Sequence, residues 1–144
     1  MAPVIQTIDQ LDDIVALLSE CGLPTADITA AQPPLFFAVQ EDKQLAAVIG
    51  FERFGTVGLL RSLAVAPAFR GRGLAQALVA HVERLAKAQD VATLYLLTTS
   101  ADGFFARLGY ATLERSEAPP TIRATAQFAG LCPASSTFMG KSLV

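Results

Sequence analysis

The amino-acid sequence predicts a single mixed α/β domain that spans residues 1–144. A chain of 144 residues suits one domain and can bury roughly 68–70% of its unfolded surface. Hydrophobic residues make up 52% of the chain and charged residues 17%, which argues against disorder. Strand-like and helix-like segments alternate along the chain, without an internal repeat or a linker. This alternation is typical of an α/β fold.

The first half of the chain is predicted to hold one helix and four strands. Asp9 offers a side-chain oxygen to the free amides at the start of the helix, and Gly22 marks its end. Two apolar runs around a Glu-Asp-Lys turn predict a β-hairpin. In order, the predicted segments are a strand at 4–8, a helix between Asp9 and Gly22, an irregular Pro-containing segment at 23–34, hairpin strands at 35–39 and 45–51, and a strand at 57–65.

The second half of the chain is dominated by one amphipathic helix, predicted at residues 74–88. Leu74, Leu78, Val82 and Leu85 form an apolar stripe on it. The remaining predicted segments are a strand at 93–98, a helix at 101–108 ended by Gly109, a strand at 110–113, a turn at 116–120, a helix at 121–129 and a strand at 137–143.

Composition and charge narrow the function classes. Eleven Lys and Arg against thirteen Asp and Glu give a net charge of −2, which disfavours a nucleic-acid partner. Cys21, Cys132 and the single histidine, His81, are too few for a disulfide framework or a zinc site, so no metal is expected. No secretory signal and no apolar run of membrane-spanning length is visible, so we expect a cytoplasmic protein without a membrane partner.

A turn rich in glycine and arginine joins the strand at 57–65 to the long helix. A helix N-terminus presents free N–H groups and the positive end of the helix dipole, so it attracts phosphate. Gly71 and Gly73 remove Cβ atoms that would keep a ligand away, while Arg70 and Arg72 add charged donors. The alternative is an ordinary connection with strain-relieving glycines and solvated arginines. A nucleoside-triphosphate P-loop is excluded because this turn lacks Gly-Lys-Ser/Thr, and Gln76 argues against a dinucleotide fingerprint.

Residues 70–75, Arg-Gly-Arg-Gly-Leu-Ala, fit the Arg/Gln-x-x-Gly-x-Gly/Ala signature of the GNAT N-acetyltransferase superfamily. Residues 104–110 resemble that family's Phe-Tyr-x-x-x-Gly-Phe helix end, and the resemblance covers essentially the whole chain. A narrower likeness is to the arsenic-resistance N-acetyltransferases (ArsN type), some relatives of which acetylate amino-acid analogues that carry arsinate or phosphinate. It is carried by residues 96–99, 103–110, 118–119, 122–125 and 131–135.

The GNAT resemblance implies a mixed, mostly antiparallel sheet flanked by helices and splayed at the site for acetyl-CoA, the co-substrate. A backbone N–H near Val65 would then face the thioester carbonyl. Phe105 stands where many GNAT enzymes have a tyrosine that protonates the CoA thiolate, and phenylalanine cannot do this. The residues implied to bind acetyl-CoA are Leu63, Ala64, Val65, Arg70, Gly71, Arg72, Gly73, Leu74, Ala75, Phe104 and Phe105.

Each candidate residue for catalysis or acceptor binding also has an alternative interpretation without a role in the reaction. Glu52 is the candidate general base, or else a surface carboxylate, and His81 is a titratable group or an exposed helix residue. Arg61, in an apolar strand, either binds a substrate carboxylate or forms a buried ion pair, and Arg123 is a weaker candidate for the same anion. Cys132 either bears an acyl group or binds trivalent arsenic, or it is a buried core thiol.

The sequence therefore predicts an enzyme that transfers acetyl from acetyl-CoA to a primary amine of a small molecule, by direct attack in a ternary complex. An amino acid or analogue with a second anionic group is the expected acceptor. The alternatives are a degenerate acyl-CoA-binding sensor and a thiol-based arsenic-binding accessory protein. The protein is expected to be a monomer or a homodimer.

Overall fold

A computed structural model describes residues 3–26, 28, 34–131 and 135–144. Its seven strands form one sheet in the order β1-β2-β3-β4-β5-β7-β6, in which only the β4–β5 pair is parallel. Short helical turns at Pro67–Phe69, Arg115–Glu117 and Gln127–Leu131 complete the fold. The main elements are β1 (Gln6–Ile8), α1 (Leu11–Glu20), β2 (Leu35–Glu41), β3 (Gln44–Phe54), β4 (Val57–Val65), α2 (Leu74–Ala88), β5 (Thr93–Thr98), α3 (Asp102–Arg107), β6 (Ala111–Leu113), α4 (Pro120–Arg123) and β7 (Thr137–Ser142).

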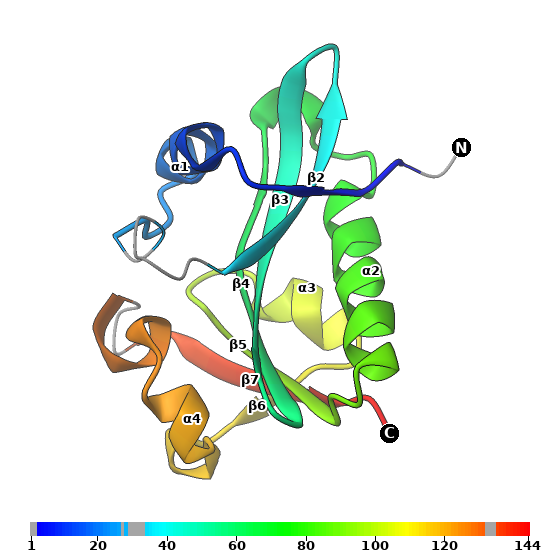
Figure 1. The fold of residues 1–144 in the computed structure, drawn as a ribbon. Helices are drawn as coiled ribbons and strands as arrows, with labels where there is room; N and C mark the ends of the chain where they lie inside the picture. The colour runs from blue at the N-terminus through cyan, green and yellow to red at the C-terminus, as the bar shows by residue number, and fades with distance from the viewer. Residues whose placement is uncertain (1–2, 27, 29–33, 132–134) are drawn as a thin grey trace.

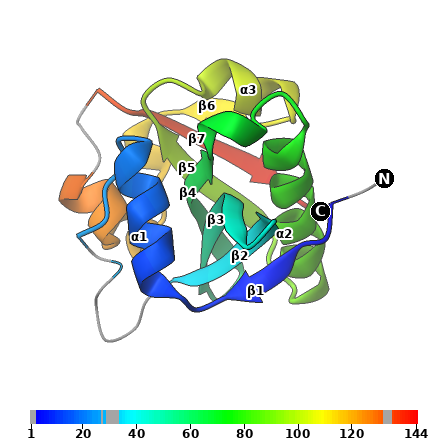
Figure 2. The ribbon, with the colours of Figure 1, turned by 90° about the horizontal axis from the view of Figure 1, so that it is seen from above.

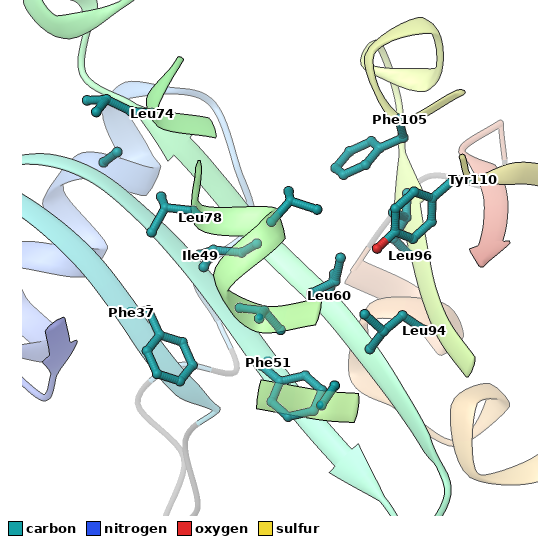
Figure 3. Packing of buried hydrophobic residues seen from close by; sticks show 14 of the residues in the cluster. Phe37, Ile49, Phe51, Leu60, Leu74, Leu78, Leu94, Leu96, Phe105 and Tyr110 are labelled. Atoms are coloured by element: carbon teal, nitrogen blue, oxygen red, sulfur yellow. The ribbon is translucent and has the colours of Figure 1, made fainter. Parts of the chain in front are cut away.

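Helices cover both faces of the sheet. Figures 1 and 2 show α2 and α3 on one face and α1 and α4 on the other. The α2 face holds the largest apolar cluster, which includes Val82 of α2. In this cluster Leu78 of α2 packs with Ile49 and Leu60 of the sheet (Figure 3). Smaller clusters lie under α1 and under α4. The strands are anchored from both sides, which is the arrangement expected of an α/β domain.

The sheet splits between β4 and β5. These strands pair only from Val57↔Thr93 to Leu59↔Tyr95. Beyond Leu59, β4 continues along β3 to Val65, while β5 stays paired with β7 up to Thr98 (Figure 1). The two strands therefore separate toward the start of α2, and the predicted splayed sheet is confirmed.

A β-bulge lies in β4 on the open side of this split. Val48 pairs with Ala64 but Gly50 pairs with Arg61, so Ile49 faces two residues of β4. One of the two, Ser62, has a φ of +55°, a conformation that non-glycine residues rarely adopt. Leu60, just before the bulge, lies in the apolar cluster under α2.

Most of the predicted elements are confirmed, and two expectations are wrong. Residues 57–65, 74–88 and 93–98 form β4, α2 and β5 with the predicted bounds. Asp9 is not the N-cap of α1, because the helix starts after Gln10 and has no side-chain cap there. The predicted helix at 121–129 is broken because Thr125 donates its hydroxyl to Ile122 O (2.7 Å) and accepts the Phe128 N–H (3.2 Å).

A substitution at Gly58 tests how tightly side chains pack at the β4–β5 junction. A Cβ atom at Gly58 would lie 2.5 Å from Phe51 Cε1 and 3.0 Å from Leu94 Cδ2, both in buried side chains. We expect Gly58→Ala to lower the free energy of unfolding by about 1–3 kcal/mol through overpacking, measured by urea denaturation. Gly130→Ala is the control, since a Cβ there has nothing within 4 Å. Equal unfolding midpoints for the two variants would contradict this account of the junction.

Candidate functional site

The split sheet opens into a cleft of about 1260 Å³. β4 forms one wall, and β5 with α3 forms the other. The end of α1 and the turn before α2 close the outer part of the cleft. The described lining residues are Cys21–Pro24, Ile49, Leu60–Val65, Phe69–Gly71, Gly73–Gln76, Leu96–Ala101, Phe104, Phe105 and Gln127.

The N-terminus of α2 faces this cleft. Gly73, the N-cap residue, is left-handed with a φ of +76°, and no side chain caps the helix among the described residues. Gly71 also has a positive φ, +82°, and a Cβ atom there would meet nothing within 4 Å. The free N–H groups of the first helical turn therefore remain available to an anion in the cleft. The space beside Gly71 admits a phosphate close to the backbone.

The two arginines of the turn have different roles. Arg70 lines the cleft, and its Nε donates to Val65 O at 3.1 Å. Arg72 is absent from the described lining and forms an ion pair with Glu41 of β2, Nη1 to Oε2 at 3.0 Å. The Arg72 guanidinium also lies over the Phe69 ring, 5.0 Å from its centroid. Of the predicted anion-binding pair, the structure brings only Arg70 to the cleft.

Arg61 is buried and also lines the cleft. Only 1% of its side chain is exposed, and its Nη1 lies 3.1 Å from Oε1 of Glu52, which is 26% exposed. Its Nε donates to Ser62 Oγ at 3.0 Å. Gly50 makes room for this side chain, because a Cβ there would lie 3.0 Å from Arg61 Cγ. The buried ion pair foreseen for Arg61 is present. Glu52 is not among the described lining residues.

Aromatic residues of α3 form the wall opposite β4. α3 starts where Thr98 Oγ1 accepts the Ala101 N–H at 2.9 Å, and this places Phe104 and Phe105 against the cleft. Phe105 packs edge-on against Tyr110, with centroids 5.5 Å apart. Tyr110 donates its hydroxyl to Glu83 of α2 at 2.8 Å, and burial, with a smaller contribution from the Glu83 charge, raises its pKa far above the usual range. Tyr110 is therefore not a proton donor for the cleft.

Other predicted site residues lie elsewhere. Arg123 is exposed on α4 and absent from the described lining, and Cys132 lies outside the described residues. His81 is on α2, where its ring packs edge-on against Phe37 at 4.9 Å. Partial burial and the nearby Arg84 lower the pKa of His81. It is absent from the described lining as well.

Sequence reasoning missed Ser62, Cys21 and Gln127 as lining residues. A single polar residue between Arg61 and Leu63 in an apolar strand was the one available signal for Ser62. Cys21 and Gln127 reach the cleft only through long-range packing, which leaves no local pattern. The described part of the chain contains no group of three His, Cys, Asp or Glu side chains suited to a metal ion.

A model of the Acetyltransferase (GNAT) family matches residues 6–110 of the sequence. The chain belongs to the GNAT acetyltransferase family. Its split sheet and its Gly-rich helix start are therefore the GNAT fold in this chain. Among the helices that the structure describes, none combines the length and apolar character needed to cross a membrane.

Individual relatives of this GNAT chain are distant. An uncharacterized N-acetyltransferase from Chlorobaculum tepidum is 38% identical over 71 residues, which are 48% of this chain and 45% of that protein. The N-acetylglutamate synthase of Neisseria gonorrhoeae, crystallised with coenzyme A and N-acetyl-glutamate, matches 100% of this chain and 36% of its own, with a TM-score of 0.82 and 22% identity. Rv2747 from Mycobacterium tuberculosis, solved in complex with CoA, matches with a TM-score of 0.76 and 19% identity over 99% of this chain and 100% of its own. The matches cover less than half the length of the first two proteins.

The Arg61–Glu52 pair is expected to stabilise this GNAT fold. Glu52→Gln removes a negatively charged partner of a guanidinium that is 1% exposed. We expect a loss of about 1–3 kcal/mol in unfolding free energy, below the roughly 3–5 kcal/mol of a fully buried pair because Glu52 is 26% exposed. Urea denaturation measures the loss.

Glu41→Gln is the matched control for that prediction. Glu41 and its partner Arg72 have side chains that are 43% and 52% exposed, so this pair should contribute only about 0–1 kcal/mol. If Glu52→Gln unfolded at the same urea concentration as Glu41→Gln, the burial of Arg61 would add nothing to the contribution of its ion pair to stability.

Proposed function

We propose that the chain is an acetyl-CoA-dependent N-acetyltransferase that acetylates a primary amine of a small molecule within a ternary complex. One observation carries this proposal: the β4–β5 split opens directly onto an uncapped helix N-terminus. A long ligand with an anionic group and an extended arm fits that combination. Membership of the GNAT family supports the same donor.

The cleft offers separate positions for the two parts of acetyl-CoA. The first N–H groups of α2, with Gly71, Gly73 and Arg70, would hold the diphosphate. The edge of β4 beyond Leu59 has no strand beside it on the β5 side in the described structure, so its backbone would pair with the pantetheine arm as an added strand does. Acetyl-CoA supplies the acetyl thioester from which the acetyl group passes to the amine.

The chain's own contribution to the chemistry is mainly positioning. Holding an amine against a thioester in an apolar cleft can supply roughly 7–11 kcal/mol of the rate acceleration. A backbone N–H on the free edge of β4 would stabilise the charge that develops on the thioester oxygen. Phe104 and Phe105 exclude water from the opposite wall.

We further propose that the acceptor is an amino acid or an analogue with a second anionic group, such as an arsinate or phosphinate. Arg61 supports this class, because it places a guanidinium in the lining of an otherwise largely apolar cleft. The resemblance to ArsN-type enzymes points the same way. The similar fold of N-acetylglutamate synthase, crystallised with N-acetyl-glutamate, is consistent with an amino-acid acceptor.

A second candidate function is an acyl-CoA-binding sensor. The described lining of the cleft includes neither a carboxylate nor a histidine nor a tyrosine, and Phe105 replaces the usual acid. Binding of CoA by calorimetry, with no thiol release on any amine, would favour the sensor.

Arg70 and Arg72 provide a matched pair for testing the donor site. We expect Arg70→Ala to weaken CoA binding about 10-fold, since it removes a charged donor beside the diphosphate position. Arg72→Ala should change the Kd less than about twofold, because Arg72 is engaged with Glu41. Isothermal titration calorimetry with CoA measures both. Equal losses in the two variants would place the anion outside the described cleft.

The acceptor class is tested by a panel of amines with thiol release as the readout. L-glutamate, L-aspartate and a phosphinate-bearing amino acid should be acetylated faster than L-alanine, spermidine or an aminoglycoside. Arg61→Met should remove the preference for the second anionic group, seen as a higher KM for the anionic amines only. Turnover restricted to spermidine or the aminoglycoside would refute the anionic acceptor and leave the donor site standing.

A further inference from the structure

We propose that the Ser62 hydroxyl donates a hydrogen bond to the sulfur atom of CoA. Phe105 cannot make this bond, because its side chain has no hydroxyl. This inference rests on the proposed function, because it assumes that CoA binds in the β4–β5 cleft. It assigns a catalytic role to a residue that carries no part of the known motifs. Three features of Ser62 support it: its position, its conformation and its hydrogen bonding.

Ser62 lies where the reactive end of the donor must reach. The diphosphate position is at the start of α2, which follows the C-terminal end of β4. An arm that pairs with the free edge of β4 therefore runs from Val65 back toward Leu59, where the split closes. Ser62 lies between these two residues and lines the cleft. At about 3.3 Å per residue, it is roughly 10 Å along the strand from both Val65 and Leu59.

The conformation of Ser62 is unfavourable, which indicates that its side chain is held in place for a reason other than stability. Ser62 has a φ of +55° in the middle of a strand. This conformation is unfavourable for any residue other than glycine, because the Cβ atom then lies too close to the following carbonyl oxygen. Serine also has low strand propensity compared with the apolar residues around it. The bulge at this point sets the direction of the side chain.

The hydrogen bonding of Ser62 leaves its proton available. Its Oγ accepts the Nε–H of Arg61 at 3.0 Å, and a guanidinium has no lone pair to take a proton in return. Within the part of the chain that the structure describes, Ser62 does not donate its hydroxyl to another group. The acceptor it faces in the cleft is therefore the ligand. Arg61 polarises the hydroxyl by donating to its oxygen, and this strengthens the bond that the hydroxyl donates.

The role of Ser62 follows from the bonds and protons that change during acetyl transfer. The N–C bond of the amide forms while the C–S bond of the thioester breaks, and the sulfur keeps that electron pair. The amine releases one proton to solvent, and the sulfur later takes one from solvent. A serine hydroxyl is a much weaker acid than a thiol, so Ser62 keeps its proton and stabilises the developing charge on sulfur by hydrogen bonding.

The first experiment titrates the thiol of bound CoA and needs no acceptor. The ultraviolet absorbance of the thiolate is followed against pH in complexes of CoA with the full chain. We expect the thiol of CoA bound to the unsubstituted protein to titrate at a lower pH than the thiol of free CoA in the same buffer. Ser62→Ala should raise the pKa of the bound thiol by about one unit, the size expected for one lost hydrogen bond to a charged group. Ser19→Ala, on the exposed side of α1, is the serine control and should leave it unchanged.

Two further variants separate a hydrogen bond from a structural effect. Ser62→Gly also lacks the hydroxyl but relieves the left-handed strain, so it should raise the thiol pKa as much as Ser62→Ala while unfolding at a higher temperature than that variant. Glu52→Gln removes the negative charge that lies beside Arg61. The pKa of the bound thiol should therefore fall or stay unchanged, but not rise. A merely structural effect on Arg61 would move the Ser62 and Glu52 variants in the same direction.

Kinetics give the second readout. Ser62→Ala and Ser62→Gly should each lower kcat about 10-fold with little change in the KM for acetyl-CoA, since the bond strengthens only as the sulfur leaves. A bound thiol with the same pKa in Ser62→Ala as in the unsubstituted protein would overturn the inference, even if turnover were normal. Failure of the unsubstituted protein to bind CoA would instead overturn the proposed function and this inference with it.

Discussion

The parallel contact between β4 and β5 ends at Leu59 and Tyr95, and the position of the whole site depends on that ending. Backbone N–H and C=O groups inside a protein need partners, so an open strand edge between two helix-covered faces calls for a ligand or water. β3 continues to hold β4, and β7 continues to hold β5, so neither strand can relax to close the split. The fold thus keeps a backbone edge available for binding, while β3 and β7 hold in place the two strands that form it.

The start of α2, at the mouth of the cleft, also keeps backbone groups available for a ligand. A serine, threonine or aspartate at the N-cap of α2 would stabilise the helix by roughly 1 kcal/mol, but its side chain would occupy the N–H groups that an anion needs. Gly73 leaves them free. The helix is held instead by its apolar stripe, in which Leu78 and Val82 are fully buried. Figure 3 shows Leu78 beside Ile49 of the sheet. Packing on one side of α2 therefore allows its end to remain open for binding.

Local patterns predicted the frame of the site but not the details that depend on register and on distant residues. The apolar runs and glycines of residues 57–65, 74–88 and 93–98 fixed three element bounds, because burial and period are local properties. The bulge at Ser62 depends on the register of β4 against β3, which local sequence does not reveal. Arg72 and Glu41 are far apart in sequence, so their pairing was not predictable. The sequence left two alternatives open for Arg61; the structure shows the ion pair, and binding of a substrate carboxylate stays a prediction.

Arg61 connects the two halves of the candidate chemistry. Its planar guanidinium donates Nη1 to Glu52 and Nε to Ser62, so it links a carboxylate near the surface to a hydroxyl in the cleft. The field of the Arg61 charge acts on Ser62 across the hydrogen bond of 3.0 Å between them. An anionic acceptor that approached Arg61 would draw on the same field, and would weaken the polarisation of Ser62 while it bound. Under the two proposals, binding of the acceptor and stabilisation of the leaving sulfur would therefore be coupled through one side chain, Arg61.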